Sequence, residues 1–206
     1  MKMKLGLRWI RAIAISFFLL ISISSSAEVL KIVVNDTIQP ITEEYIARAI
    51  AEAQRGHDQA LLIELNTPGG LLDSTRDIIH NIVTSPVPVI IYVSPAGSRA
   101  ASAGFFILES ADIAAMAPGT NTGAAHPVLM GGGKMDDVMK QKIENDAAAF
   151  MRSFVSKRGR NVDVAESTVR QSKSLTDEEA LKQNLINYVA PNEGELFKQI
   201  SAQPVN

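Results

Sequence analysis

Strand-like and helix-like segments alternate along this chain from residue 29 onward, and this alternation restricts the fold more than any other feature. Segments with apolar residues at helical spacing, beginning with 42–54 and 71–85, lie between runs of β-branched and apolar residues. Strands separated by helices of this length form a mostly parallel sheet with helical crossovers. The 206 residues therefore predict one α/β domain. Its strands are predicted at 29–35, 59–65, 87–93, 113–117 and 187–190.

Three of the predicted helices carry further marks in the sequence. Thr42 is expected to cap the helix of 42–54, because a threonine at this place can accept a hydrogen bond from the first turn. A long amphipathic helix is predicted from Met135 to Lys157. Further on, Thr176 and Glu179 have the spacing of a capping box, which predicts a helix start at this threonine.

The first 27 residues have the pattern of a secretory signal peptide. Basic residues precede the apolar stretch Ala12–Ile23, and Ser25 and Ala27 are the small residues expected before a cleavage site. An uncleaved membrane anchor is the alternative, but 12 apolar residues fall short of the ~20 that span a bilayer. We expect a signal peptide at 1–27, a single domain at 28–206 and an extracytoplasmic location. The basic residues are Lys2, Lys4, Arg8 and Arg11.

Composition and spacing exclude several classes of function. There are no cysteines, and the three histidines lie far apart without ligand-like spacing to carboxylates, so we expect neither a metal nor a cofactor. The net charge is −2 even with the basic N-terminus included, which gives no footprint for nucleic acid. GGGK at 131–134 fails as a phosphate-binding loop, because Met135 stands where a serine or threonine is required. The histidines are His57, His80 and His126, of which the last could line a cleft.

Ser102 lies among alanines and glycines in SRAASAG, shortly after the strand of 87–93. It is either a nucleophile or a filler residue where two elements pack closely, and this segment alone leaves both open. A second segment, NTPGG at 66–70, exposes backbone N–H groups directly after another strand. Those groups and the N–H of Ala103, at a helix start, could together form an oxyanion hole beside the serine hydroxyl.

Four segments in order resemble the NfeD-like membrane-associated serine proteases: 66–70, 94–127, 142–161 and 174–186. The resemblance runs from about residue 29 to the C-terminus. These proteases share their fold with the Clp proteolytic subunit and signal-peptide peptidase A. The resemblance implies a ClpP/crotonase-like spiral of ββα units with a mostly parallel sheet, assembled as a homodimer or larger homo-oligomer. It also implies a peptide or protein substrate, namely hydrophobic segments of membrane-associated, stomatin-like proteins.

The same resemblance implies a Ser–Lys dyad. Ser102 matches the family's nucleophile and Lys142, in K-I-x-N, matches its general base. Gly70 and Ala103 match the residues whose amides form the oxyanion hole. An extended substrate is expected along the same Pro-Gly-Gly segment, with Gly69 and Leu71 as substrate-binding residues.

A lysine accepts a proton only when it is neutral, so the pKa of the base must fall from about 10.4 to roughly 7–8. This shift corresponds to about 4 kcal/mol and requires an apolar surrounding. The helix of 135–157 has an apolar stripe, with Lys142 at its margin and Lys140 nearer its centre. Helical geometry therefore does not select Lys142, the family pattern does, and Lys140 and Lys134 remain alternatives. The stripe consists of Met139, Ile143, Ala147, Phe150 and Phe154.

Two other functions compete with a serine endopeptidase. The same spiral fold hosts acyl-CoA enzymes of the crotonase type, but these would leave Ser102 unexplained. A catalytically silent module that binds a membrane partner is the other alternative. The presence of Ser102, Lys142 and Pro-Gly-Gly in one chain favours the enzyme.

Overall fold

The computed structural model describes residues 28–128 and 136–202. The predicted signal peptide at 1–27, the GGGK segment and the alternative base Lys134 lie outside the described residues. Within these limits, no helix is both long enough and apolar enough to cross a membrane.

The main sheet has five parallel strands in the order β1-β2-β3-β5-β8. β2 and β3 occupy its interior and are almost wholly buried, which explains their continuous apolar runs. All five predicted strands are present. Their bounds are β1 Val29–Asn35, β2 Ala60–Asn66, β3 Val89–Val93, β5 Ile113–Met116 and β8 Tyr188–Val189.

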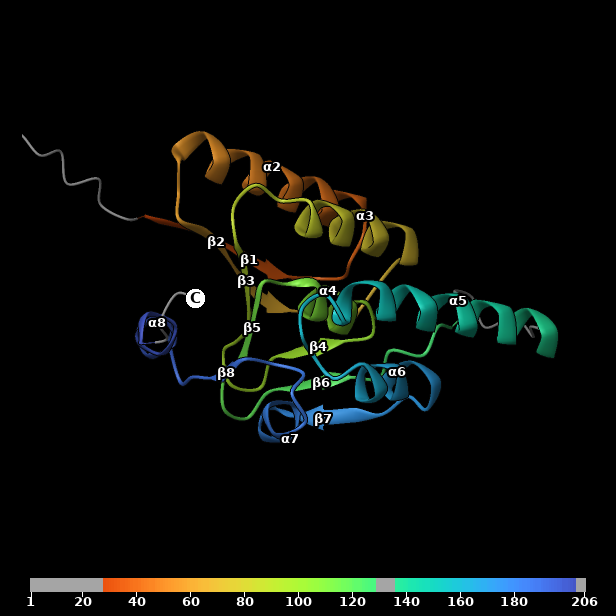
Figure 1. Cartoon of the computed structure of the whole chain (residues 1–206). Coiled ribbons are helices and arrows are strands. Elements are labelled where there is room, and N and C mark those ends of the chain that lie inside the picture. The colour runs from red at the N-terminus through yellow and green to blue at the C-terminus, as the bar shows by residue number, and fades with distance from the viewer. Residues whose placement is uncertain (1–27, 129–135, 203–206) are drawn as a thin grey trace, which may run out of the picture.

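Helices cover both faces of this sheet (Figure 1). Alternate residues of β2 divide between the faces: Leu61 and Ile63 belong to the large core, and Leu62 belongs to a smaller one. The large core lies against α2 (Pro40–Gly56), α3 (Leu72–Val83), α4 (Ala103–Ser110) and the following helices. The smaller core is closed by Leu196 of α8 (Glu193–Ser201).

A second, three-stranded sheet lies beside the first, and the sequence did not predict it. β4 (Arg99–Ala101) pairs in parallel with β6 (Asn121–Gly123), which pairs antiparallel with β7 (Ser174–Thr176). Each strand has only three residues, too few for a period to be visible. The remaining helices are α5 (Asp137–Val155), α6 (Val162–Arg170) and α7 (Asp177–Lys182), of which α6 was also not predicted.

The predicted cap at Thr42 is wrong, whereas the predicted capping box is confirmed. α2 begins at Pro40, because proline fixes the backbone angle of a first helical position, and Gln39 is its N-cap. The Thr42 hydroxyl lies inside the first turn and donates to the carbonyl of Thr37 at 2.9 Å. At α7, the N–H of Glu179 donates to the Thr176 hydroxyl at 3.2 Å, and the N–H of Thr176 donates to the Glu179 carboxylate at 2.9 Å.

Candidate active site

The fold brings the NTPGG and SRAASAG segments together through Thr67. This residue follows β2 and is fully buried. Its N–H donates to the carbonyl of Arg99 at 2.7 Å, and its carbonyl accepts from the N–H of Ala101 at 3.1 Å. The exit of β2 is therefore hydrogen-bonded to β4, the strand that ends one residue before Ser102.

Both glycines of the Pro-Gly-Gly turn lie where a side chain does not fit. A Cβ atom on Gly69 would lie 2.7 Å from the Cβ of Ser102, and the φ of Gly69 is 113°. A Cβ atom on Gly70 would lie 2.0 Å from the carbonyl oxygen of Ile38. The two glycines therefore allow the backbone to pass between Ser102 and Ile38.

The hydrogen bonds to Ile38 fix the orientation of the Gly70 peptide. The N–H of Ile38 donates to the carbonyl of Gly69 at 2.9 Å, and the N–H of Leu71 donates to the carbonyl of Ile38 at 2.8 Å. In an extended chain the intervening residue points its own N–H and carbonyl to the opposite side. The N–H of Gly70 makes no hydrogen bond to any residue that the structure describes.

Ser102 is the N-cap residue of α4 and has an unusual backbone conformation, with φ 53° and ψ −115°. A non-glycine residue at positive φ is strained and must be held by its surroundings. Here the N–H of Ser102 donates to the carbonyl of Gly123 at 2.8 Å. Within the described residues, neither the Ser102 hydroxyl nor the N–H of Ala103 at the helix start has a hydrogen-bond partner.

A mostly apolar cavity of about 400 Å³ opens at this point. Gly70, Ser102 and Ala103 lie in its wall, so the nucleophile candidate and both oxyanion-hole candidates share one space. Leu71 also lines the cavity, but Gly69 lies behind the wall, against Ser102. The remaining wall is formed by Leu72, Thr75, Phe106, Ala125, Pro127, Val128 and Ile143.

Lys142 is not placed in this cavity. It lies on α5, where Ile143 lines the cavity, but its own side chain is exposed. Lys140 is also exposed. The apolar enclosure that a lysine base requires is not formed around either amine by the part of the chain that the structure describes. The assignment of Lys142 as the base stays a prediction.

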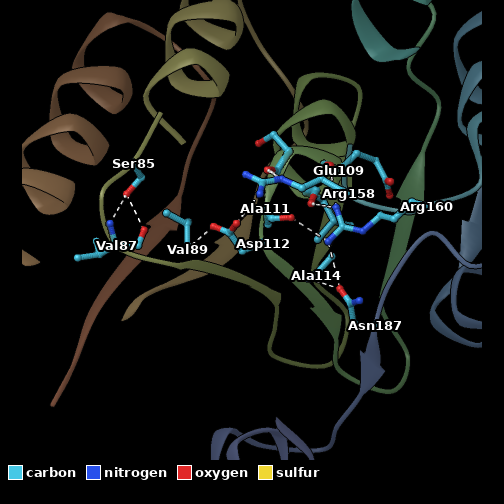
Figure 2. Close-up of polar contacts among 12 residues, drawn as sticks. Ser85, Val87, Val89, Glu109, Ala111, Asp112, Ala114, Arg158, Arg160 and Asn187 are labelled. Carbon is cyan, nitrogen blue, oxygen red and sulfur yellow. Dashed lines mark hydrogen bonds and ion pairs between the residues drawn. The ribbon is translucent and has the colours of Figure 1, made fainter. Parts of the chain in front are cut away.

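Arginines from the segment after α5 bind the C-terminal end of α4, at the opposite end from Ser102 (Figure 2). Arg160 is buried and donates to the carbonyls of Glu109 at 2.6 Å and Ala111 at 2.9 Å. Arg158 donates to the carbonyl of Ser110 at 2.8 Å. Cations at a helix C-terminus complement its negative end. This role was not predicted from the sequence, although both arginines lie in a segment that carries the family resemblance.

Glu109, in the last turn of α4, is fully buried, and neither of its carboxylate oxygens has a hydrogen-bond partner among the described residues. Burial raises the pKa of this carboxyl to about 8, although the nearby charge of Arg160 acts in the opposite direction. Glu109 is therefore mostly protonated at neutral pH.

The free energy of unfolding is expected to fall as the pH rises from about 4.5 to 8. In this range the folded chain keeps a proton on Glu109, whereas the unfolded chain, with its ordinary carboxyl pKa near 4.5, releases it. The loss amounts to at most about 1.4 kcal/mol per pH unit, the limit for a single proton, and levels off above pH 8. Glu109→Gln removes this contribution. In urea unfolding at pH 5, 6.5 and 8, the free energy of unfolding of the variant relative to wild type should therefore increase with pH. Parallel pH profiles of the two proteins would contradict the assignment.

His126 lies between two cavity-lining residues, Ala125 and Pro127, but does not itself line the cavity. Its ring Nδ1 lies 2.9 Å from the carbonyl oxygen of Val169 at the end of α6. The N–H of Ala125 donates to the carbonyl of Thr168 at 3.1 Å. His126 thus attaches the cavity wall to α6 and is not among the described residues that line the cavity, in contrast to the role that its place in the sequence allowed.

Several known proteins resemble this chain. The membrane-bound protease PH1510 of Pyrococcus horikoshii is 37% identical over 206 residues, which is 95% of this chain but 46% of PH1510. This chain therefore spans less than half the length of that relative.

Solved structures of a related protease also resemble this chain. A serine-to-alanine variant of the 1510-N membrane-bound stomatin-specific protease has a TM-score of 0.78 at 38% identity, covering 83% of each chain. A lysine-to-alanine variant of 1510-N in complex with a substrate peptide has a TM-score of 0.79 at 37% identity, covering 84% of this chain and 80% of that one.

ClpP1 from Listeria monocytogenes shares the fold, with a TM-score of 0.64 at 15% identity over 81% of this chain and 94% of ClpP1. The predicted α/β fold of the Clp type, with its mostly parallel sheet, is confirmed. The family resemblance is confirmed as well. Residues 28–196 match the NfeD1b N-terminal domain, and the chain therefore belongs to the NfeD1b family.

Proposed function

We propose that this protein is a serine endopeptidase. One observation carries the proposal: Ser102, strained at the start of α4, shares a mostly apolar cavity with the amides of Gly70 and Ala103, neither of which has a hydrogen-bond partner among the described residues. A nucleophilic hydroxyl beside two free N–H donors is the arrangement that acyl transfer requires. The 1510-N structures of serine and lysine variants, one holding a substrate peptide, support the same chemistry.

Each residue then has a defined role. The Ser102 hydroxyl attacks the peptide carbonyl, and Lys142 accepts its proton. The amides of Gly70 and Ala103 stabilise the oxyanion, which forms inside the mostly apolar cavity. The same proton moves to the leaving amine, and water then hydrolyses the acyl-enzyme with Lys142 again as the base.

The substrate is an apolar peptide segment that lies extended along Gly69–Leu71. The outward-facing N–H and carbonyl of Gly70 can pair with a peptide main chain, as an added strand does. Apolar walls such as Leu72 and Phe106 favour an apolar side chain beside the scissile bond. A membrane-associated, stomatin-like protein is the proposed partner, since 1510-N is named as specific for stomatin.

Location and assembly are part of the same proposal. The pattern of residues 1–27 favours export, so we place the enzyme outside the cytoplasm, at or near a membrane. A homodimer or larger homo-oligomer is proposed, because the first turns of α5 leave Val138 and Met139 exposed and a second copy could cover them.

One observation favours the alternative of a catalytically silent binding module. The Lys142 side chain is exposed, and nothing in the described part of the chain encloses it. A silent module would bind an apolar segment in the same cavity without cleaving it.

Two measurements on the exported protein test the endopeptidase proposal. A serine-reactive fluorophosphonate should label wild type on the peptide that contains Ser102, because an activated hydroxyl reacts with it. A panel of peptides should show faster cleavage of apolar than of highly charged sequences. Absence of both labelling and peptide cleavage would favour the silent module, and equal cleavage of charged peptides would contradict an apolar substrate.

A further inference from the structure

The first turns of α5 have little contact with the rest of the molecule. Residues 137–142 are exposed, and the first buried residues of the helix are Ala147 and Ala148. In Figure 1 this end of α5 extends past α3 and α6. Lys142 lies at the boundary, just before the helix reaches its neighbours. Its position relative to Ser102 therefore depends on the contacts that begin in the next turn.

Arg170, the last residue of α6, makes the polar contacts with α5 that lie nearest in sequence to Lys142. Its guanidinium donates to the side-chain oxygen of Asn145 at 2.9 Å and lies 3.3 Å from the carboxylate of Glu144. It also donates to Glu166 of its own helix at 2.6 Å. One planar group thus joins two consecutive residues of α5 to α6. Asn145 is the last residue of the K-I-x-N pattern, and none of the proposed catalytic roles explains why an asparagine stands there.

The guanidinium is itself held in place. Arg170, followed by Arg152, lowers the pKa of Glu166, which is therefore ionised at neutral pH and fixes the Arg170 side chain. The backbone around Arg170 is fixed too, since the neighbouring carbonyls of Thr168 and Val169 bind Ala125 of the cavity wall and the adjacent His126.

On the opposite side of α5, Arg76 of α3 binds Asp146 and lies 4.3 Å over the ring of Phe150. The first turn of α3 contributes Leu72 and Thr75 to the cavity. The turn after Lys142 is therefore attached to α3, which lines the cavity, and to α6, which is hydrogen-bonded to the cavity-lining residue Ala125.

We propose that Arg170 is a positioning residue, which aligns Lys142 with Ser102 by holding the Glu144–Asn145 turn of α5 against α6. This inference rests on the proposed function, because it assigns Arg170 a role in the reaction. Arginine is suited to this role because its rigid planar fork presents five donors in fixed directions, whereas a lysine carries three donors on a single flexible point charge.

Arg152 provides a matched control. It joins the same two helices through the same Glu166, at 2.7 Å, but binds ten residues beyond Lys142. Ten residues of α-helix place Arg152 about 15 Å from Lys142 along the helix axis. Both arginines are partly exposed, with 34% and 42% of their side chains accessible, so neither variant should prevent folding.

The test compares Arg170→Met with Arg152→Met in peptide hydrolysis. Arg170→Met should lower kcat about 10-fold and leave KM within about 2-fold, since a small misplacement of a catalytic group is costly while the cavity is unchanged. Arg152→Met should stay within about 2-fold of wild type in both constants, with a similar melting temperature. In the Asn145→Ala background, Arg170→Met should have less effect than in wild type, because the two residues act together.

Hydrogen exchange of the α5 backbone amides measures the effect of the Arg170 contact on this helix independently of catalysis. Arg170→Met should speed exchange over residues 138–146, and Arg152→Met should not. Equal kinetics and equal exchange in the two variants would overturn the positioning role. A wild-type protein that cleaves no peptide and takes no fluorophosphonate label would overturn the proposed function instead, whatever the exchange shows.

Discussion

Ser102→Ala is expected to lower kcat/KM for peptide hydrolysis by about 10⁴-fold or more and to abolish fluorophosphonate labelling. The hydroxyl supplies the electrons for the acyl bond, and no other described residue of the cavity wall can replace it. Among these residues Thr75 has the only other hydroxyl, and it donates to the carbonyl of Leu71 at 2.6 Å. Steady-state kinetics on an apolar peptide, with labelling followed by mass spectrometry, measure both effects.

Binding and stability should survive this substitution. The Ser102 hydroxyl has no hydrogen-bond partner among the described residues, and alanine keeps the Cβ atom that packs against Gly69. Ser102→Ala should therefore unfold within about 0.5 kcal/mol of wild type and still bind the peptide. Loss of folding would mean that Ser102 is a packing residue. Unchanged hydrolysis would mean that another group is the nucleophile.

The main sheet could be predicted from the sequence because its strands are buried on both faces. Residues 60–66 and 89–93 have continuous apolar runs, and the helices between strands repeat their apolar residues at helical spacing. The capping box at Thr176 could also be predicted, because Thr176 and Glu179 lie within one helical turn of each other. Such local and periodic signals need no knowledge of distant contacts.

The small sheet and the attachments of α4 could not be predicted in the same way. β4, β6 and β7 are held by pairing between segments that lie far apart in the chain, and three residues show no period. Arg160 is a charged residue that is buried only because carbonyls at the end of α4 receive its guanidinium. Composition predicts an exposed arginine there.

The candidate site also has one part that could be predicted from the sequence and one part that could not. The proximity of Pro-Gly-Gly to Ser102 could be inferred, because both follow neighbouring parallel strands whose carboxyl ends meet at one edge. The position of Lys142 could not be inferred from helical geometry, which favours Lys140. The structure leaves both amines exposed, so only the family pattern separates them.

Lys142→Ala is expected to lower the rate of acylation by about 10²–10⁴-fold, the contribution that a general base typically makes. Lys140→Ala is the matched control, because it removes an equally exposed amine two residues away on the same helix. We expect it to stay within about threefold of wild type, since a lysine that does not touch the reacting groups contributes little. Both variants should keep the stability of wild type, because neither amine forms an ion pair in the described parts of the chain.

The pH dependence distinguishes a proton acceptor from a lysine that only binds substrate. Only the neutral amine can accept the Ser102 proton, so wild-type acylation should rise with pH, and Lys142→Ala should lose that rise as well as the rate. Single-turnover acylation of the three proteins from pH 6 to 10 measures both properties. If Lys140→Ala is the inactive variant, the apolar stripe of α5 identifies the base and the K-I-x-N pattern does not. If Lys142→Ala is slow but keeps the pH-dependent rise, Lys142 orients the substrate and another group takes the proton.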